Sequence, residues 1–392
     1  MKLPMFLWII TIFPLSLRIK IKKRNRKTMA FEASRRDWSE LYSFFRLLAD
    51  GYVYTGRVDG SANEEKKLKV ALVQREEHDG TRKYIIEGED IHIVGEGRDE
   101  RFPREDFATV AMLVGDMLRQ NGGDEELTSP DGVEEFLDAV AIYNLEAKTD
   151  DRTDFYVAFW SVDAPLMGFR SYSRLGGMLP LLDGGRAANI KFEQTGVRFP
   201  NPTVNKINWL ESPNEVLDRM LMIERMGGTL KYNDVADKVF RSNLLMIDLH
   251  FPRIAAEMLR TMYYEGITRV SELTERIKEI NPLKIKTELI EKHRFYEFKV
   301  KQFLFALAMG MRPAKLYNGT DSAVEGFIYT DAEGRTLCYH KADRQTFEDF
   351  LYNHTRLEKG PLEKDKYGYL ERENNLYYFK LNLKVGFVKR NK

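Results

Sequence analysis

The chain has 392 residues, of which 43% are hydrophobic and 12% aromatic, and this composition is too apolar for a disordered protein. Its single cysteine, Cys338, excludes an internal disulfide and a zinc site built from several cysteines. The formal net charge of +1 hides an asymmetry, because residues 1–28 contain eight Lys or Arg and no acid. The rest carries 53 basic and 60 acidic residues, so a nucleic-acid partner would need a local basic cleft.

The first 28 residues join an apolar stretch, LPMFLWIITIFPLSL, to a basic one, RIKIKKRNRK. Three interpretations stay open. A signal peptide lacks a small-residue cleavage site here, and 15 apolar residues with two prolines are short for a membrane span of about 20. The third, a true start at Met29, is favoured, because the following sequence starts like an ordinary cytosolic domain. We therefore expect a cytoplasmic protein with no membrane partner.

The first strongly periodic segment is 35–51, whose apolar residues follow helical spacing. Ser34 followed by Asp37 predicts the start of this helix, and Gly51 predicts its end. Strand-like runs separated by Gly and Asp turns come next, over 66–74, 82–88 and 90–97. Two further helices are predicted over 107–121 and 132–142.

The second half begins with DFYVAFW (154–160), which is apolar on both faces, as expected of a central strand. Helices are predicted over 214–228, 251–266 and, as one long element, 285–311. The end of the chain is predicted as strand, helix and hairpin, over 336–340, 344–355 and 369–387.

Residues 168–177, GFRSYSRLGG, are predicted to pair with 154–160 as an antiparallel hairpin. With the turn centred on Asp163, Asp154 lies opposite Tyr172. Directly opposed residues share a face of the hairpin, with Cβ atoms about 5 Å apart.

Arg170 and Arg174 are the diagonal neighbours of Asp154 on that face. Phosphodiester hydrolysis needs such a site, because carboxylates hold Mg²⁺, the metal lowers the pKa of bound water, and a nearby cation stabilises the phosphoryl charge. A surface hairpin with ordinary cross-strand ion pairs explains the same residues, so both interpretations stay open.

A second acid, Glu40, lies at the rim of the apolar face of helix 35–51, where Leu41 and Phe44 flank it. A glutamate in this position is more often solvated than functional. It gains a role only if the first helix packs beside the central strand.

The segment LLDGGRAANIKFEQTGVRF (181–199) contains a loop-forming Asp-Gly-Gly-Arg sequence. It carries the side chain types that read base edges, since Arg pairs with guanine and Asn or Gln with adenine. We list Arg186, Asn189, Lys191 and Gln194 as DNA-binding candidates. A solvated polar turn between strands is the alternative.

Several functional classes are excluded by missing motifs. The sequence has no Walker loop, no HExxH and no GxSxG, which removes P-loop nucleotide hydrolases, zincin proteases and α/β-hydrolases. The six histidines are scattered, and His250 and His340 are interpreted as structural.

Six stretches carry a resemblance to a known family: DWSELYSFFRLLADG, LEAKTDDRTDF, the GF–S–S–RLG pattern of 168–176, ALAMGMRPAKLYNGT, LCYHKADRQTFEDFLYNHTRLE and YYFKLNLKVGF. With these, the chain resembles the HpaII-type family of type II restriction endonucleases from about Arg35 to Phe387. The C-terminal stretches are the most specific. One departure is Asn-His-Thr-Arg at 353–356, where the family usually has Asn-Thr-Lys or similar.

The resemblance implies a nuclease fold of the PD-(D/E)xK kind, with a metal site on two adjacent strands of a mixed sheet. By position, Asp154 would be the metal-binding aspartate, and Glu40 would match the first-helix glutamate that many of these nucleases add. Arg170, Tyr172 and Arg174 would shape the phosphate pocket, and Mg²⁺ would be the cofactor.

The chain departs from the family at the second strand, where the usual pattern is GF-S-I-K-S. The lysine aligns on Tyr172, and no acid stands two residues before it. Three explanations stay open: Arg170 or Arg174 supplies the positive charge, Lys191 reaches in from the next strand, or the chain binds DNA without cutting it.

These arguments predict an α/β fold with a mixed central sheet flanked by helices, restriction-endonuclease-like, and a C-terminal α+β region. We divide the chain into an N-terminal extension (1–28), a nuclease core (29–320) and a strand-helix-hairpin region packed on that core (321–392). The predicted function is a Mg²⁺-dependent type II endonuclease acting on short, CCGG-like sites in double-stranded DNA. A homodimer and an accompanying DNA methyltransferase are expected, and the alternative is a catalytically impaired DNA-binding module.

Overall fold

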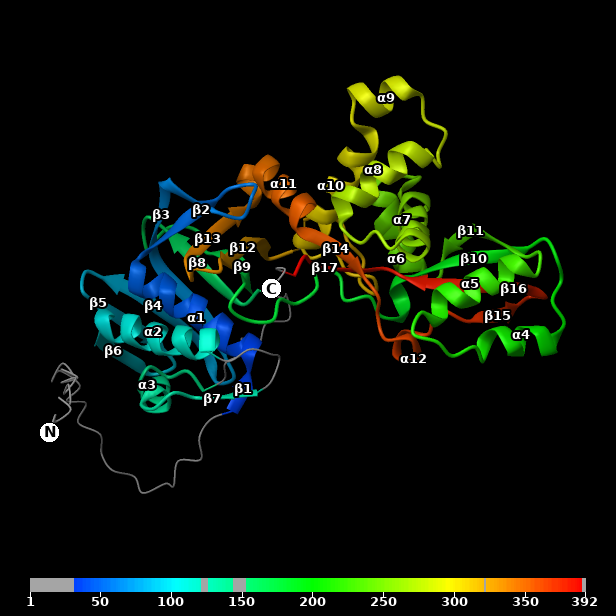
Figure 1. The fold of residues 1–392 in the computed structure, drawn as a ribbon. Helices are drawn as coiled ribbons and strands as arrows, with labels where there is room; N and C mark the ends of the chain where they lie inside the picture. Colours follow the sequence, from blue (N-terminus) through cyan, green and yellow to red (C-terminus); the bar gives the residue numbers. More distant parts are fainter. Residues whose placement is uncertain (1–31, 121–125, 144–152, 321, 390–392) are drawn as a thin grey trace, which may run out of the picture.

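The structure, a computed structural model, describes residues 32–120, 126–143, 153–320 and 322–389. The predictions made for 1–28 lie outside these residues. The chain forms two lobes joined by a narrower region that contains β14 (Thr355–Glu358) and β17 (Lys384–Phe387), as Figure 1 shows.

The first lobe is built on a mixed nine-stranded sheet, which confirms the predicted α/β class with a mixed central sheet. β12 runs parallel to β9, and β13 runs parallel to β2, while the remaining neighbours are antiparallel. In spatial order the strands are β2 (Tyr52–Gly56), β13 (Thr336–His340), β12 (Val324–Thr330), β9 (Met167–Ser173), β8 (Phe155–Phe159), β3 (Ala62–Glu77), β4 (Gly80–Glu87), β5 (Asp90–Gly95) and β6 (Arg98–Pro103).

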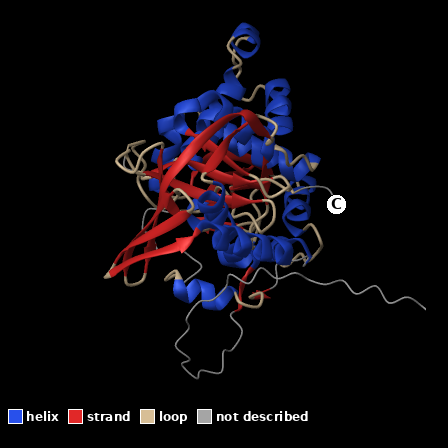
Figure 2. Ribbon diagram, turned by 90° about the vertical axis from the view of Figure 1, so that its left-hand side faces the viewer, coloured by secondary structure: helices blue, strands red, loops and turns tan. Residues whose placement is uncertain are grey.

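Helices cover both faces of this sheet (Figure 2). The alternation along β12 identifies the two layers, because successive strand residues point to opposite faces. Ile328 joins the apolar cluster of α1 (Arg35–Asp50) and α2 (Arg104–Gln120). Phe327 and Tyr329 join the cluster of α10 (Phe295–Ala308) and α11 (Arg344–His354).

Smaller elements close the bottom of this lobe in Figure 1. β1 (Glu32–Ser34) pairs with β7 (Glu126–Thr128), and α3 (Val133–Ala139) packs near them. Trp38 of α1 is fully buried, and its indole Nε1 donates to the carbonyl oxygen of Leu127 in β7 at 2.9 Å. This hydrogen bond ties the first helix, α1, to β7.

The predicted limits of α1 are confirmed. Ser34 is its N-cap, and its hydroxyl accepts a hydrogen bond from the Asp37 amide at 3.2 Å. Gly51 ends the helix in the left-handed conformation with φ +65°, which a glycine adopts without a steric penalty.

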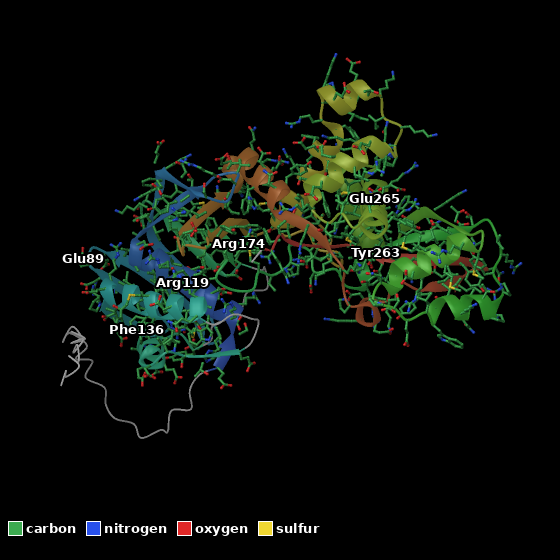
Figure 3. All side chains as sticks on the ribbon, viewed as in Figure 1. Glu89, Arg119, Phe136, Arg174, Tyr263 and Glu265 are labelled. Atoms are coloured by element: carbon green, nitrogen blue, oxygen red, sulfur yellow. The ribbon has the colours of Figure 1, made fainter. Side chains whose placement is uncertain are left out.

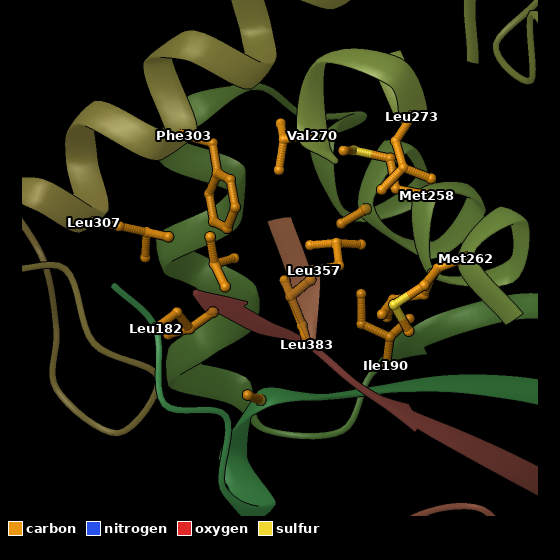
Figure 4. Close-up of a cluster of buried hydrophobic side chains, with 14 of the residues drawn as sticks. Leu182, Ile190, Met258, Met262, Val270, Leu273, Phe303, Leu307, Leu357 and Leu383 are labelled. Atoms are coloured by element: carbon orange, nitrogen blue, oxygen red, sulfur yellow. The ribbon is translucent and has the colours of Figure 1, made fainter. Parts of the chain in front are cut away.

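The second lobe has a four-stranded antiparallel sheet in the order β11, β10, β16, β15. Its strands are β10 (Asn189–Thr195), β11 (Thr229–Val235), β15 (Leu370–Glu373) and β16 (Leu376–Asn382). Its helices are α4 (Asn201–Asn208), α5 (Glu215–Arg225), α6 (Lys238–Ile247), α7 (Phe251–Glu265), α8 (Val270–Ile280), α9 (Thr287–Lys292) and α12 (Leu362–Asp365). Figure 4 shows the apolar side chains packed between these helices and strands.

One apolar cluster runs through both lobes. It includes Ile190 of β10, Phe303 of α10 and Phe327 of the nine-stranded sheet. The two lobes therefore share one close-packed hydrophobic core, to which α10 contributes.

The predicted single helix over 285–311 is wrong. The structure has two helices, α9 and α10, separated at Arg294, whose φ of +50° is incompatible with a continuing right-handed helix. α9 has no buried residue, so no packing on the core aligns it with α10.

The C-terminal residues are distributed over both lobes. β12 and β13 complete the nine-stranded sheet, whereas β15 and β16 form half of the second sheet. The predicted hairpin over 369–387 is present, with Asn374 and Asn375 at its turn, both at positive φ. Its last segment, β17, leaves the hairpin and pairs with β14. Among the described residues, no helix combines the length and apolar composition needed to cross a membrane.

Asn189 ties the start of β10 to the C-terminal segment. It is 2% exposed, and its Nδ2 donates to the carbonyl oxygens of Asp365 at 2.8 Å and Lys366 at 3.1 Å. Its Oδ1 accepts from Nδ2 of Asn382 at 2.8 Å. All these groups are buried or half-buried, so loss of the amide would leave several of them without a partner.

We predict that Asn189→Ala lowers the free energy of unfolding by about 2–3 kcal/mol, because buried polar groups lose their hydrogen bonds. Chemical denaturation followed by circular dichroism measures this change. Arg186→Ala is the matched control from the same segment, because Arg186 is exposed, and it should change the unfolding energy by no more than about 0.5 kcal/mol. Equal effects of the two substitutions would contradict a structural role for Asn189.

Candidate active site

Asp154 lies directly before β8, at the open end of the β8–β9 hairpin. Its amide donates to the carbonyl oxygen of Phe169 at 2.8 Å, and its Oδ2 accepts from the Ser171 amide at 2.6 Å. The carboxylate is therefore fixed by the backbone of the neighbouring strand β9.

The register of this hairpin differs from the predicted one by two residues. Phe155 pairs with Phe169 and Tyr156 with Gly168, which places Arg170, and not Tyr172, across from Asp154. In the loop, the amide of Ala164 donates to the carbonyl oxygen of Ser161 at 3.1 Å. The pairing of the two strands is therefore centred one residue earlier than the predicted centre, Asp163.

Burial raises the pKa of the Asp154 carboxyl above its usual value. The positive charge of Arg170, the amide of Ser171, and the charges of Arg36 and Arg75 all act in the opposite direction. Desolvation disfavours the charged form of a carboxyl group, whereas nearby cations favour it. Asp154 itself is half-buried, and a carboxyl group under such opposing influences is typical of functional sites.

Arg170 and Tyr172 point to the buried side of β9. Arg170 is 5% exposed, and its guanidinium lies 5.0 Å from the centre of the Tyr172 ring. Tyr172 is 2% exposed, and its ring packs on those of Phe327, at 4.4 Å, and Phe387, at 4.8 Å. The residue at the expected lysine position is thus an aromatic side chain of the core, closed off from solvent.

Arg174 follows β9 and lies where the two lobes meet, as Figure 3 shows. Its Nε donates to the Tyr329 hydroxyl at 2.5 Å and its Nη1 to the carbonyl oxygen of Val388 at 2.7 Å. These contacts hold the guanidinium at the junction, on the side of the first lobe.

Glu40 is 5% exposed and lies on α1, which packs on β3 and β9. The condition set by the sequence, a first helix beside the central strands, is therefore met. Arg36 and Phe44 lie one turn to either side of Glu40 on the same helix face. Arg36 acts on the Asp154 carboxyl, and the Phe44 ring lies 6.4 Å from that of Phe155. Glu40 therefore lies on the face of α1 that also carries Arg36 and Phe44.

The four candidates in 181–199 lie in the second lobe, apart from this hairpin. The Asn189 amide is used by the contacts described above. Gln194 is 7% exposed, and its Nε2 donates to the carbonyl oxygens of Thr195 and Val197, both at 2.8 Å. Arg186 is exposed, and its Nε donates to the carbonyl oxygen of Lys364 at 3.2 Å.

Lys191 does not lie on a strand next to Asp154. β10 belongs to the second sheet, and the Lys191 Nζ lies 2.6 Å from a carboxylate oxygen of Glu373 and 4.3 Å from the ring centre of Tyr378. In this structure Lys191 supplies no charge to the Asp154 site.

A cleft separates the two lobes on one side. It consists of a main hollow of about 1060 Å³ and two side hollows of about 520 and 470 Å³, all three lined by Lys389. Tyr263 and Glu265 line the main hollow on the second lobe, opposite Arg174, which lines both side hollows (Figure 3). We call these three hollows the interlobe cleft.

The main hollow is strongly basic. Its lining contains six cationic side chains and two carboxylates; the cations are Arg35, Arg36, Arg356, Lys359, Lys384 and Lys389. This group of cations could hardly be predicted from the sequence, because its members lie in segments far apart along the chain. The adjacent arginines at the start of the first predicted helix were the one local cue.

Within the described residues, no group of three or more His, Cys, Asp or Glu side chains is arranged to hold a metal ion. Mg²⁺ does not require such a group, since it is commonly bound by one or two carboxylates together with waters and substrate phosphates. Asp154 at the hairpin end and Glu40 on the helix that packs on β3 and β9 supply the two carboxylate side chains that such a mode of binding uses.

Comparisons with known proteins show the family of this chain. The HpaII restriction endonuclease family matches residues 34–387. The type II restriction enzyme HpaII of Haemophilus parainfluenzae is 29% identical over 370 residues, which cover 92% of this chain and 100% of that enzyme. No solved structure matches the chain. Because the family match covers nearly the whole described chain, the protein belongs to the HpaII restriction endonuclease family.

Proposed function

We propose that this protein is a type II site-specific endonuclease that hydrolyses phosphodiester bonds in duplex DNA, with Asp154 as the central metal-binding carboxylate. The observation that carries the proposal is the half-buried Asp154 carboxylate, which accepts a hydrogen bond from the Ser171 amide across from the buried Arg170. Membership of a family of DNA-cleaving enzymes supports it. The restriction-endonuclease-like arrangement of the fold is part of the same proposal.

Asp154 and Glu40 would hold Mg²⁺. When bound, the ion lowers the pKa of a coordinated water and offsets negative charge on the phosphate. The protein's own contribution is to orient the Asp154 carboxylate through the hydrogen bond from the Ser171 amide. A cation bound there would offset the cost of burying that charge.

Arg170 and Arg174 are the proposed sources of positive charge for the phosphate pocket. Arg170 lies across from Asp154, and Arg174 lies at the edge of the interlobe cleft. Arginine stabilises phosphoryl charge but cannot act as a base, because its pKa stays above about 12 in proteins. Activation of the attacking water therefore falls to the metal site.

Family membership suggests a short palindrome such as CCGG as the target. A palindromic site suits a two-fold symmetric enzyme, so we propose a homodimer. A DNA methyltransferase acting on the same sequence would accompany the enzyme, because unmodified host DNA would otherwise be cut.

We predict that Asp154→Asn lowers the rate of plasmid cleavage by a factor on the order of 10³ or more, because the metal loses its charged ligand. Affinity for duplex DNA should remain within about threefold, since the phosphate contacts do not involve this carboxylate. Gel analysis of fragments in Mg²⁺ and in EDTA measures cleavage, and fluorescence anisotropy measures binding.

Asp163→Asn is the matched control, because Asp163 is an exposed acid in the loop of the same hairpin. It should cut at the wild-type rate. Cleavage that survives in Asp154→Asn would place the metal site elsewhere.

A second candidate function is a DNA-binding module that has lost cleavage. It is favoured by the burial of Tyr172 at the position where the family pattern has lysine. The two functions differ in one assay, because only the enzyme yields discrete fragments that disappear with a chelator.

We predict that Tyr172→Phe keeps cleavage within about threefold of wild type and costs at most about 1.5 kcal/mol of unfolding free energy, because the ring and not the hydroxyl fills the core. Tyr172→Lys should cost about 3 kcal/mol or more, since it buries an ammonium group between two aromatic rings. Thermal melting and digestion assays on both variants test this. A large loss of rate in Tyr172→Phe alone would give the hydroxyl a chemical role.

A further inference from the structure

The positive charge that DNA binding requires is concentrated in one part of this protein. Beyond residue 28 the chain has more acids than bases, so its average surface does not attract nucleic acid. The main hollow of the interlobe cleft inverts this balance, with six cations and two carboxylates in its lining. The local basic cleft that a nucleic-acid partner requires is therefore present between the lobes.

The lysines of the cleft are held only loosely by the protein. Lys359 and Lys389 are exposed, and the Lys359 Nζ lies 5.3 Å from the centre of the Tyr263 ring. Lys384 Nζ lies 3.2 Å from a carboxylate oxygen of Asp183, whose side chain is 75% exposed. Solvated contacts of this kind stabilise a fold by less than about 1 kcal/mol, so a phosphate can replace them at little cost.

The cleft is connected to the proposed active site through Arg36. This residue lines the main hollow, is partly exposed, and belongs to the first turn of α1. It lies one turn before Glu40 on α1, the helix that packs on β9 beside the Asp154 hairpin end. A polyanion lying in the main hollow would thus pass the first turn of the helix that covers this hairpin.

We propose that the backbone of duplex DNA lies in the interlobe cleft, with Lys359, Lys384 and Lys389 contacting its phosphates and Arg36 directing it toward Asp154. This inference rests on the proposed nuclease function, which it extends by assigning the DNA path. It moves the contacts with DNA away from Asn189, Lys191 and Gln194, whose side chains are engaged inside the second lobe.

The test compares two triple variants that remove the same charge. The cleft variant is Lys359→Gln/Lys384→Gln/Lys389→Gln. The control variant is Lys206→Gln/Lys231→Gln/Lys238→Gln, which changes three exposed lysines of the second lobe that do not line the cleft. Binding of a fluorescent duplex with a central CCGG site is measured by anisotropy in EDTA and in Ca²⁺, over a range of salt concentrations.

We expect the cleft variant to bind about tenfold or more weakly near 0.15 M salt, and its plot of log affinity against log salt to lose about 2–3 units of slope, because each lost phosphate contact removes about 0.9. The control variant should bind within about twofold of wild type, with an unchanged slope. A duplex without CCGG should show the same loss in the cleft variant, since phosphate contacts carry no sequence information.

Three results are informative beyond this. Equal binding by the two variants, with a wild type that binds and cuts, overturns the DNA path and leaves the proposed function intact. A wild type that binds no duplex overturns both. Should the cleft variant melt at a lower temperature than wild type, the single variants Lys359→Gln and Lys389→Gln replace it, and each should lose about one unit of salt slope; no loss in either one overturns the path.

Discussion

The proposed site depends on one carboxyl group at the mouth of the β8–β9 hairpin, that of the half-buried Asp154. Burial raises the pKa of this carboxyl group, because desolvation disfavours its charged form. The positive charge of Arg170 and the Ser171 amide act in the opposite direction, and the hydrogen bond from that amide fixes the direction in which the carboxylate points. A bound cation would favour the charged form, so this carboxyl group suits the metal-binding role that we propose for it.

The path of the chain explains why the cleft lies beside this hairpin. The chain leaves the nine-stranded sheet after β9, builds most of the second lobe, and returns as β12 parallel to β9. Arg174 lies where it leaves, and the β14–β17 ribbon joins the two lobes beside it. Because this segment leaves from β9 and returns to the adjacent strand β12, the second lobe lies next to these two strands. A substrate held between the lobes would therefore lie near the hairpin that carries Asp154.

Features of the fold that depend on a few neighbouring residues could be predicted from the sequence. The limits of the first helix followed from Ser34 and Gly51, because a cap is decided by a few neighbouring residues. The hairpin was predictable, but its register depended on a turn hydrogen bond between Ala164 and Ser161 that composition does not reveal. The basic lining of the cleft could not be predicted, because Lys389 and the other cations meet only through the packing of the two lobes.

The tyrosine at the position where the resemblance predicts a lysine is explained by packing. Tyr172 contacts Phe327 on the neighbouring strand β12 and Phe387 on β17, so its ring ties the sheet to the ribbon that joins the lobes. A lysine there would have to leave this aromatic cluster or be buried within it at a cost of several kcal/mol. With the position taken up by packing, the proposed phosphate pocket would draw its positive charge from the flanking arginines. Because Arg170 and Arg174 cannot accept a proton, the proposed cleavage would depend on a metal-activated water.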